Sequence, residues 1–129
     1  MKVAVLIARI LLGLIFVFFG LNGFLHFIPS PPIPGPAGQF LSAIVVTHYA
    51  VAIFALQLVC GILLLAGRYV PLAITILGAI MVNILLFHIT MAPSGLPLAL
   101  ITLVLWIIVF IGVRQAFAGI FAAKVEPKV

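Results

Sequence analysis

The sequence predicts an all-α protein, an up-down antiparallel bundle of four transmembrane helices. Of its 129 residues, 67% are hydrophobic and only 5% are charged, whereas soluble domains carry about 25% charged residues. So few polar side chains cannot cover a surface in water, and lipid must be the solvent for most of the chain. Four apolar stretches also reach the roughly 20 residues that cross a bilayer. The last three are joined by short links, which make antiparallel neighbours.

The four predicted helices form one transmembrane domain, residues 1–129. They cover residues 4–28, 48–66, 70–91 and 97–119. The first stretch has the position of a cleaved signal peptide, but its apolar run is too long and no A-x-A-like site follows it. Arg9 also lies inside the run. We therefore expect a retained first helix.

The three links between the helices differ in kind. The stretch "AGRYVP" (66–71) predicts a tight turn, because Gly67 suits the end of a helix and Pro71 the start of the next. The stretch "APSGLP" (92–97) predicts a second tight turn. Between the first two helices, "PSPPIPGP" (29–36) holds five of the nine prolines, so we expect a stiff, non-helical outer loop. The apolar "AGQFLSAIVV" (37–46) should lie along the membrane interface or dip back into the bundle.

All the basic residues fall at one end of the predicted bundle. They are Lys2, Arg9, Arg68, Arg114, Lys124 and Lys128. The positive-inside rule then predicts cytoplasmic termini, with the proline-rich loop and the 92–97 turn on the outer side. We expect an integral protein of the bacterial inner membrane. The net charge of +5 does not indicate nucleic-acid binding, because the basic residues are scattered singly along the chain.

The polar residues within the apolar stretches are the candidate functional residues. Each histidine lies about 25–30 Å from the basic end of its helix, at about 1.5 Å per residue. His26, His48 and His88 should therefore share one depth near the outer membrane face. Asn22 lies one turn below His26, and Asn83 lies more than one turn below His88.

These residues allow more than one interpretation. Histidine suits a wet membrane boundary, and Asn22, Asn83 and the mid-helix Gln57 would then form interhelical hydrogen bonds, worth about 0.6 kcal/mol each on average. Alternatively, a quinone or similar apolar carbonyl compound docks between the helices at the outer side. Asn22, His26 or His88 would then donate hydrogen bonds to it, and phenylalanines would pack against its ring. The candidate ligand-binding residues are Asn22, His26, His48, Asn83 and His88.

Other cofactors fit the pattern less well. Ligation of haem or chlorophyll would need one or two of the imidazoles. A zinc site is disfavoured because no carboxylate accompanies the three histidines, and because Cys60 lies about 18 Å from His48 at helical rise. We predict no catalytic residue and no metal site.

The charged residues near the membrane raise two further points. Arg9 and Arg114 have no acidic partner in the bilayer, since the single acid of the chain is Glu126. They either snorkel to the cytoplasmic interface or form an anionic-lipid site between the first and last helices. The absence of an acid within the helices argues against proton-coupled transport, which uses such groups as relays.

Several segments resemble the DoxX-like family of small integral membrane proteins. They are "ARILLGLIFVFFGLNGFLHFIP" (8–29), the proline-rich loop, "GILLLAGRYVPLAI" (61–74) and "VNILLFHITMAPSGLPLAL" (82–100). The resemblance implies a four-helix membrane bundle with both termini inside. The family takes its name from subunits linked to terminal quinol oxidase and thiosulfate:quinone oxidoreductase activity. This chain departs from the family where Gln57 replaces a frequent Glu, and where the stretch 105–110 ("LWIIVF") lacks an acid.

The lost acids and the small loops favour a non-catalytic role. We therefore expect an accessory or structural subunit of a larger membrane electron-transfer complex, in contact with the lipid bilayer and with other membrane protein subunits. The alternative is a quinone-linked membrane oxidoreductase component with an outer-side Asn/His site. A second alternative is a small transporter, for which the polar residues are few.

Overall fold

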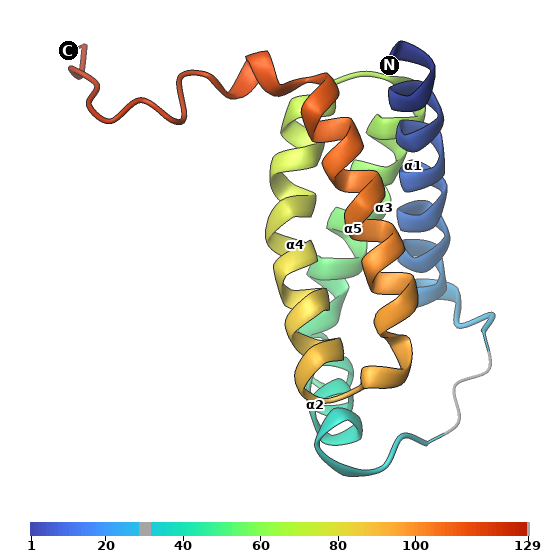
Figure 1. Ribbon diagram of the computed structural model, residues 1–129. Helices are drawn as coiled ribbons and strands as arrows, with labels where there is room; N and C mark the ends of the chain where they lie inside the picture. The colour runs from blue at the N-terminus through green and yellow to red at the C-terminus, as the bar shows by residue number, and fades with distance from the viewer. Residues whose placement is uncertain (29–31, 129) are drawn as a thin grey trace.

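Four long antiparallel helices form the body of the protein (Figure 1). The computed structural model describes residues 1–28 and 32–128. The elements are α1 (Lys2–Leu25), α2 (Gly35–Val46), α3 (Tyr49–Ala66), α4 (Val70–Thr90), η1 (Pro93–Gly95), α5 (Leu96–Gly112) and η2 (Arg114–Phe117). Within the described residues, four spans are long and apolar enough to cross a membrane: Lys2–Leu25, Tyr49–Ala66, Val70–Thr90 and Pro93–Gly112. The predicted all-α bundle is confirmed.

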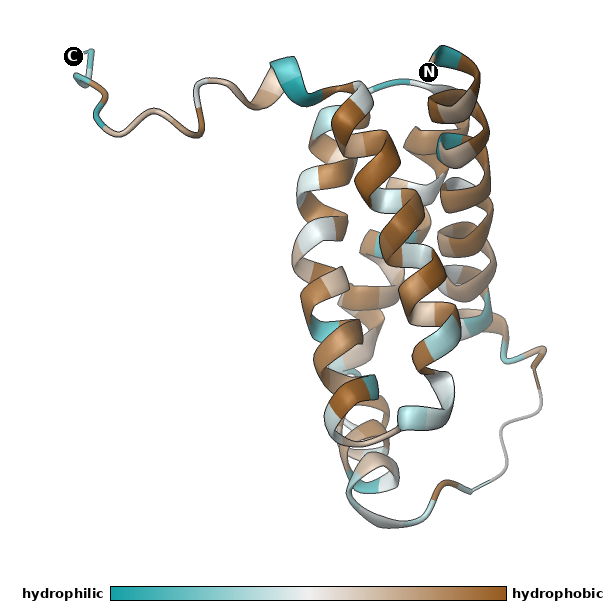
Figure 2. Ribbon diagram, in the orientation of Figure 1, coloured by the Kyte–Doolittle hydropathy of each residue, from teal (hydrophilic) through white to brown (hydrophobic). Residues whose placement is uncertain are grey.

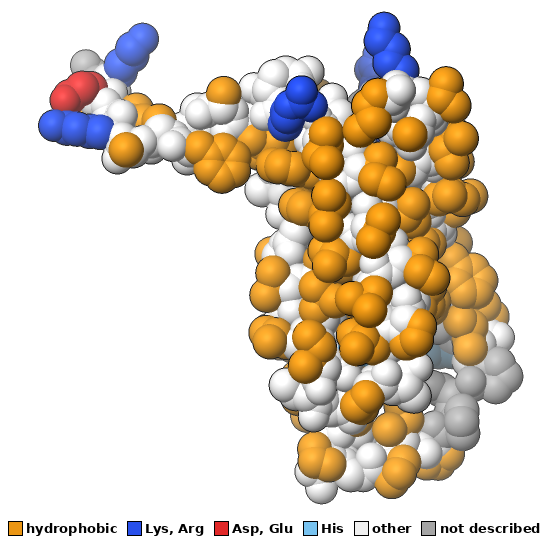
Figure 3. Space-filling view, viewed as in Figure 1, with side chains coloured by type: hydrophobic (Ala, Val, Ile, Leu, Met, Phe, Trp, Pro, Cys, Tyr) orange, Lys and Arg blue, Asp and Glu red, His pale blue; other side chains and the backbone are white. Residues whose placement is uncertain are grey.

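Both termini and the turn between α3 and α4 lie at one end of the bundle (Figure 1). The lysines and arginines gather at this end, while apolar side chains cover the visible face of the helices (Figures 2 and 3). We name it the basic end. The short helix α2 and the turn between α4 and α5 lie at the opposite end, which we name the α2 end.

Two helices end earlier than the sequence predicts. The first stops at Leu25 rather than residue 28, because His26 adopts a left-handed conformation (φ 52°) and its N–H bonds back to the Asn22 carbonyl. The last stops at Gly112 rather than residue 119, because Val113 leaves helical geometry (φ −118°) and a single 3₁₀ turn follows. At both helix ends the N–H of the next residue, His26 or Val113, still bonds back to a carbonyl of the last helical turn.

The proline-rich link contains a helix that starts earlier than expected. Part of the predicted stiff loop, residues 29–31, lies outside the described residues. Gly35 and Pro36 belong to the first turn of α2 rather than to a non-helical loop, since proline is tolerated where a helix has no internal N–H partner. Residues 37–46 continue this helix. The ring of Phe40 in α2 contacts Phe87 in α4, with ring centroids 5.7 Å apart, so α2 packs on the end of the bundle.

The helices α1 and α3 approach closely through glycines. A Cβ atom on Gly13 would lie 3.0 Å from the Gly61 carbonyl oxygen, and one on Gly20 would lie 2.8 Å from the Leu58 nitrogen. Small residues at such positions let two membrane helices pack backbone against backbone. These glycines therefore serve packing inside the bundle.

The dense part of the core lies toward the basic end. Its fully buried members include Leu12, Leu64, Ile74, Leu77 and Val109. There the indole Nε1 of Trp106 in α5 donates to the Ile74 carbonyl of α4 at 3.0 Å. The bundle is less completely filled toward the α2 end, where a cavity opens between the helices.

Candidate ligand-binding cavity

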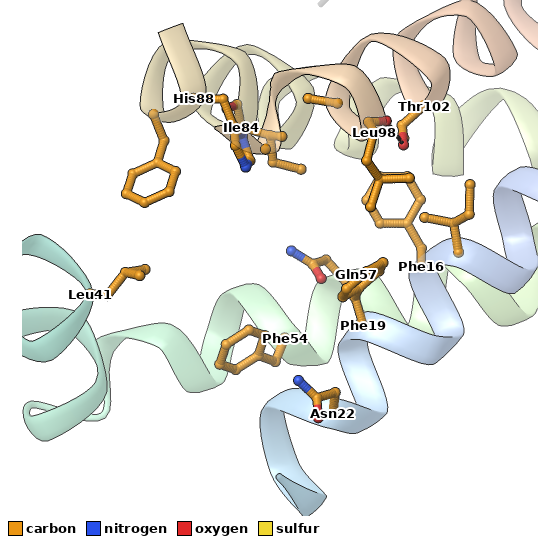
Figure 4. Close-up of a pocket in the computed structure, with 14 residues that line it drawn as sticks. Phe16, Phe19, Asn22, Leu41, Phe54, Gln57, Ile84, His88, Leu98 and Thr102 are labelled. Atoms are coloured by element: carbon orange, nitrogen blue, oxygen red, sulfur yellow. Dashed lines mark hydrogen bonds between the residues drawn. The ribbon is translucent and has the colours of Figure 1, made fainter. Parts of the chain in front are cut away.

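A cavity of about 360 Å³ lies among the four long helices near the α2 end. Its walls are mainly apolar, and Leu41 of α2 faces it from the end of the bundle (Figure 4). Its aromatic lining consists of Phe16, Phe19, Phe54 and Phe87. Its polar side chains are Asn22, Gln57, His88 and Thr102, one from each long helix. A mostly apolar cavity with a few convergent polar groups is typical of sites for small molecules.

Gln57 is the most unusual of these polar side chains. It is only 8% exposed, and within the described residues its amide makes no hydrogen bond. The side chain points into the cavity from α3 (Figure 4). Its amide is open to the cavity rather than sealed in the core, because the described residues hold no fully enclosed side-chain nitrogen or oxygen without a partner. Gln57 therefore holds unused hydrogen-bonding capacity at the cavity wall.

His88 presents one fixed edge of its ring. Its Nδ1 lies 2.8 Å from the Ile84 carbonyl oxygen. A carbonyl only accepts, so Nδ1 carries the hydrogen, and Nε2 of the neutral ring is an acceptor. The ring lies against Gly95, where an added Cβ would come within 2.6 Å of Nε2. The helix turn and the glycine together position the imidazole in the cavity (Figure 4).

Asn22 and Thr102 already use part of their hydrogen-bonding capacity. The Oδ1 of Asn22 accepts from the Ile28 N–H at 2.8 Å, which ties down the chain after α1. Among the described residues its amide nitrogen has no partner, so it is left to donate. The buried Thr102 hydroxyl donates to the Leu98 carbonyl at 2.9 Å, which leaves its oxygen as an acceptor. The cavity thus offers both donors and acceptors.

The other predicted site residues lie outside this cavity. His26 closes α1 and His48 precedes α3, both exposed and both with a left-handed backbone (φ 52° and 63°). Asn83 is exposed on α4, and its amide donates to the Ala79 carbonyl of the same helix rather than to a neighbour. Of the five predicted ligand-binding residues, Asn22 and His88 both line the cavity.

The two arginines contact different helix ends. Arg9 donates from Nη1 to the Leu64 carbonyl of α3 at 2.6 Å, and its guanidinium lies over Gly67. Arg114 is exposed and donates to the Ile111 carbonyl of α5 at 2.7 Å. In the part of the chain that the structure describes, no three His, Cys, Asp or Glu side chains gather closely enough to share a metal ion.

The long apolar helices and the cavity between them define a small polytopic α-helical membrane protein. Residues 4–90 match the DoxX family, and the chain belongs to that family. The matched segment runs from α1 to the end of α4, so it contains Asn22, Gln57 and His88, whereas Thr102 lies beyond it. Comparison with curated proteins and with solved structures gives no match for the chain.

Proposed function

We propose that this chain binds a lipid-soluble ring compound of the quinone class, as a component of a membrane electron-transfer system. The observation that carries the proposal is the amide of Gln57, which opens onto an aromatic-lined cavity inside the bundle and makes no hydrogen bond within the described residues. A ligand carbonyl or hydroxyl would satisfy this amide. The phenylalanine rings supply the apolar surface that a ligand ring needs.

The size of the cavity supports a single-ring headgroup. Its volume of about 360 Å³ stands at the low end of the roughly 300–1,000 Å³ common for ligand sites. A haem or chlorophyll macrocycle is much larger than a single ring and fits a cavity of this volume less well.

The test of this proposal is ligand binding by the full chain in lipid nanodiscs. Tetramethyl-benzoquinone and its hydroquinone would be titrated against the wild type, Gln57→Leu and Asn83→Leu. Both substitutions remove an amide from a transmembrane helix, but only Gln57 lines the cavity. Binding that Gln57→Leu weakens and Asn83→Leu leaves unchanged supports the proposal. No saturable binding of either compound to the wild type would contradict it.

A second proposal is that the chain is an accessory subunit of a larger membrane complex. It is supported by α5, which buries the smallest share of its span inside the chain, 17%. Its outer face carries exposed Leu100, Ile101 and Val104, which suit a neighbouring transmembrane subunit as well as lipid. Extraction from native membranes in mild detergent, followed by native mass spectrometry, tests it. Recovery of the chain as a lone monomer would contradict this role.

The basic end gives the proposed orientation. By the positive-inside rule it faces the cytoplasm, which places the cavity in the outer half of the bilayer. Arg9 and Arg114 are the candidate contacts for anionic lipid headgroups at the cytoplasmic side. Loss of retained anionic lipid from Arg9→Gln or Arg114→Gln in native mass spectra supports the headgroup site, and unchanged retention contradicts it.

A further inference from the structure

We infer that His88 selects ligands that donate a hydrogen bond, so the polar end of the ligand facing α4 is a hydroxyl rather than a carbonyl. The inference rests on the proposed function, because it concerns the same cavity. It also reverses the role expected from the sequence, in which His88 donates to a ligand carbonyl.

The first step is the tautomer of the imidazole. Nδ1 is directed at the Ile84 carbonyl oxygen, 2.8 Å away, in the turn of α4 below it. The opposite tautomer would set two lone pairs against each other at that distance. In the neutral ring the hydrogen therefore stays on Nδ1, and Nε2 meets the cavity as an acceptor.

The second step is the chemistry that satisfies this acceptor. A phenolic hydroxyl donates to Nε2, whereas a ligand carbonyl or ether oxygen would face it with another lone pair. An unpaired polar group in an apolar cavity loses the hydrogen bonds that water would have given it. A ligand without a donor thus leaves Nε2 unsatisfied.

The third step is the opposite side of the cavity, where the amides are less selective. Gln57 has both an oxygen and an NH₂ group without partners in the described residues, and Asn22 has an NH₂ group to spare. These groups accept either a hydroxyl or a carbonyl at the far end of the ligand. Thr102 also offers only an acceptor, because its hydroxyl already donates to Leu98. Discrimination between hydroxyl and carbonyl therefore falls to His88 and Thr102, and the variants below separate their contributions.

Three compounds that share the tetramethyl-substituted ring test this inference on the wild-type chain in nanodiscs. They are tetramethyl-hydroquinone, its dimethyl ether and tetramethyl-benzoquinone, with dissociation constants measured under conditions that keep each redox form. We expect the hydroquinone to bind about tenfold more tightly than either compound without a donor, the ratio that one lost hydrogen bond produces. Equal binding of all three would overturn the inference but leave the proposed function standing. Binding of none would overturn both.

Two variants assign the selectivity to His88. His88→Phe keeps a ring but removes the acceptor, and His88→Gln supplies both an acceptor and a donor. Both should reduce the preference for the hydroquinone to less than about threefold. His48→Asn is the control, because His48 lies outside the cavity and Asn tolerates its left-handed backbone. Retention of the full preference in a folded His88→Phe would overturn the assignment. The wild-type comparison decides the hydroxyl preference even if both variants fail to fold.

Discussion

The guanidinium of Arg9 in α1 donates to the main-chain carbonyl of Leu64 in α3, at 2.6 Å. Leu64 belongs to the last turn of α3, and apart from Arg9 its carbonyl accepts only from the Gly67 N–H that ends the helix, at 3.2 Å. A cation at a helix C-terminus also interacts favourably with the partial negative charge there. Arg9 therefore acts as an interhelical cap for α3, and its charge is satisfied without an acid.

We predict that Arg9→Gln lowers the free energy of unfolding by about 1–2 kcal/mol, because a charge-assisted hydrogen bond and a favourable dipole interaction are lost. Thermal unfolding in detergent measures this change. The matched control is Arg114→Gln, whose exposed side chain bonds only within its own helix end. Equal destabilisation by the two variants would argue against the interhelical cap.

We predict that Gln57→Leu leaves the ligand-free protein about as stable as the wild type, since the amide makes no hydrogen bond within the described residues and is open to the cavity. The same variant should lose ligand affinity. Unfolding curves recorded with and without tetramethyl-hydroquinone measure both effects. A marked loss of stability without ligand would mean that the amide has a structural partner.

We predict that Gly20→Ala destabilises the bundle by about 1–3 kcal/mol, because the new methyl group would meet the α3 backbone at Leu58. Gly119→Ala is the control, since nothing lies within 4 Å of a Cβ atom there. Thermal unfolding of the two variants side by side provides the comparison. Similar melting temperatures would mean that α1 and α3 pack less closely.

We predict that His26→Asn retains stability, whereas His26→Val lowers it by about 1–2 kcal/mol, because a β-branched residue resists a left-handed backbone. Neither substitution should change the affinity for the ring compounds. Unfolding and ligand titration of both variants check this. Weaker ligand binding by His26→Asn would mean that His26 takes part in the binding site.

Hydropathy alone was enough to predict the four long helices, because the length and composition of an apolar run decide whether it spans a bilayer. The exact ends of the helices depended on side-chain bonds, such as that between Asn22 and the Ile28 N–H. Such bonds form only after the chain has turned, so hydropathy does not reveal them.

The sequence predicts how far along its helix each candidate residue lies, but not which way its side chain points. Rise along a helix places Asn22 and His88 near one end, but it does not say which neighbour a side chain faces. Asn83 and His88 are five residues apart, so they point about 140° apart around α4. The sequence predicts Gln57 at mid-depth, in an interhelical hydrogen bond. Its position on the side of Asn22 and opposite His88 (Figure 4) depends on how α3 is rotated in the bundle.

The two ends of the bundle contribute differently to stability and to the cavity. The residues that hold the helices together, such as Leu64, Ile74 and Val109, cluster toward the basic end, whereas Phe54 and Phe87 line the cavity and lie outside that buried cluster. Changes at Phe54 or Phe87 therefore draw little on the contacts that maintain the fold, whereas Phe16 belongs to both the cavity wall and the buried cluster. Such an arrangement makes the protein evolvable, because related proteins can change which hydrophobic ligand they bind while they keep the same fold.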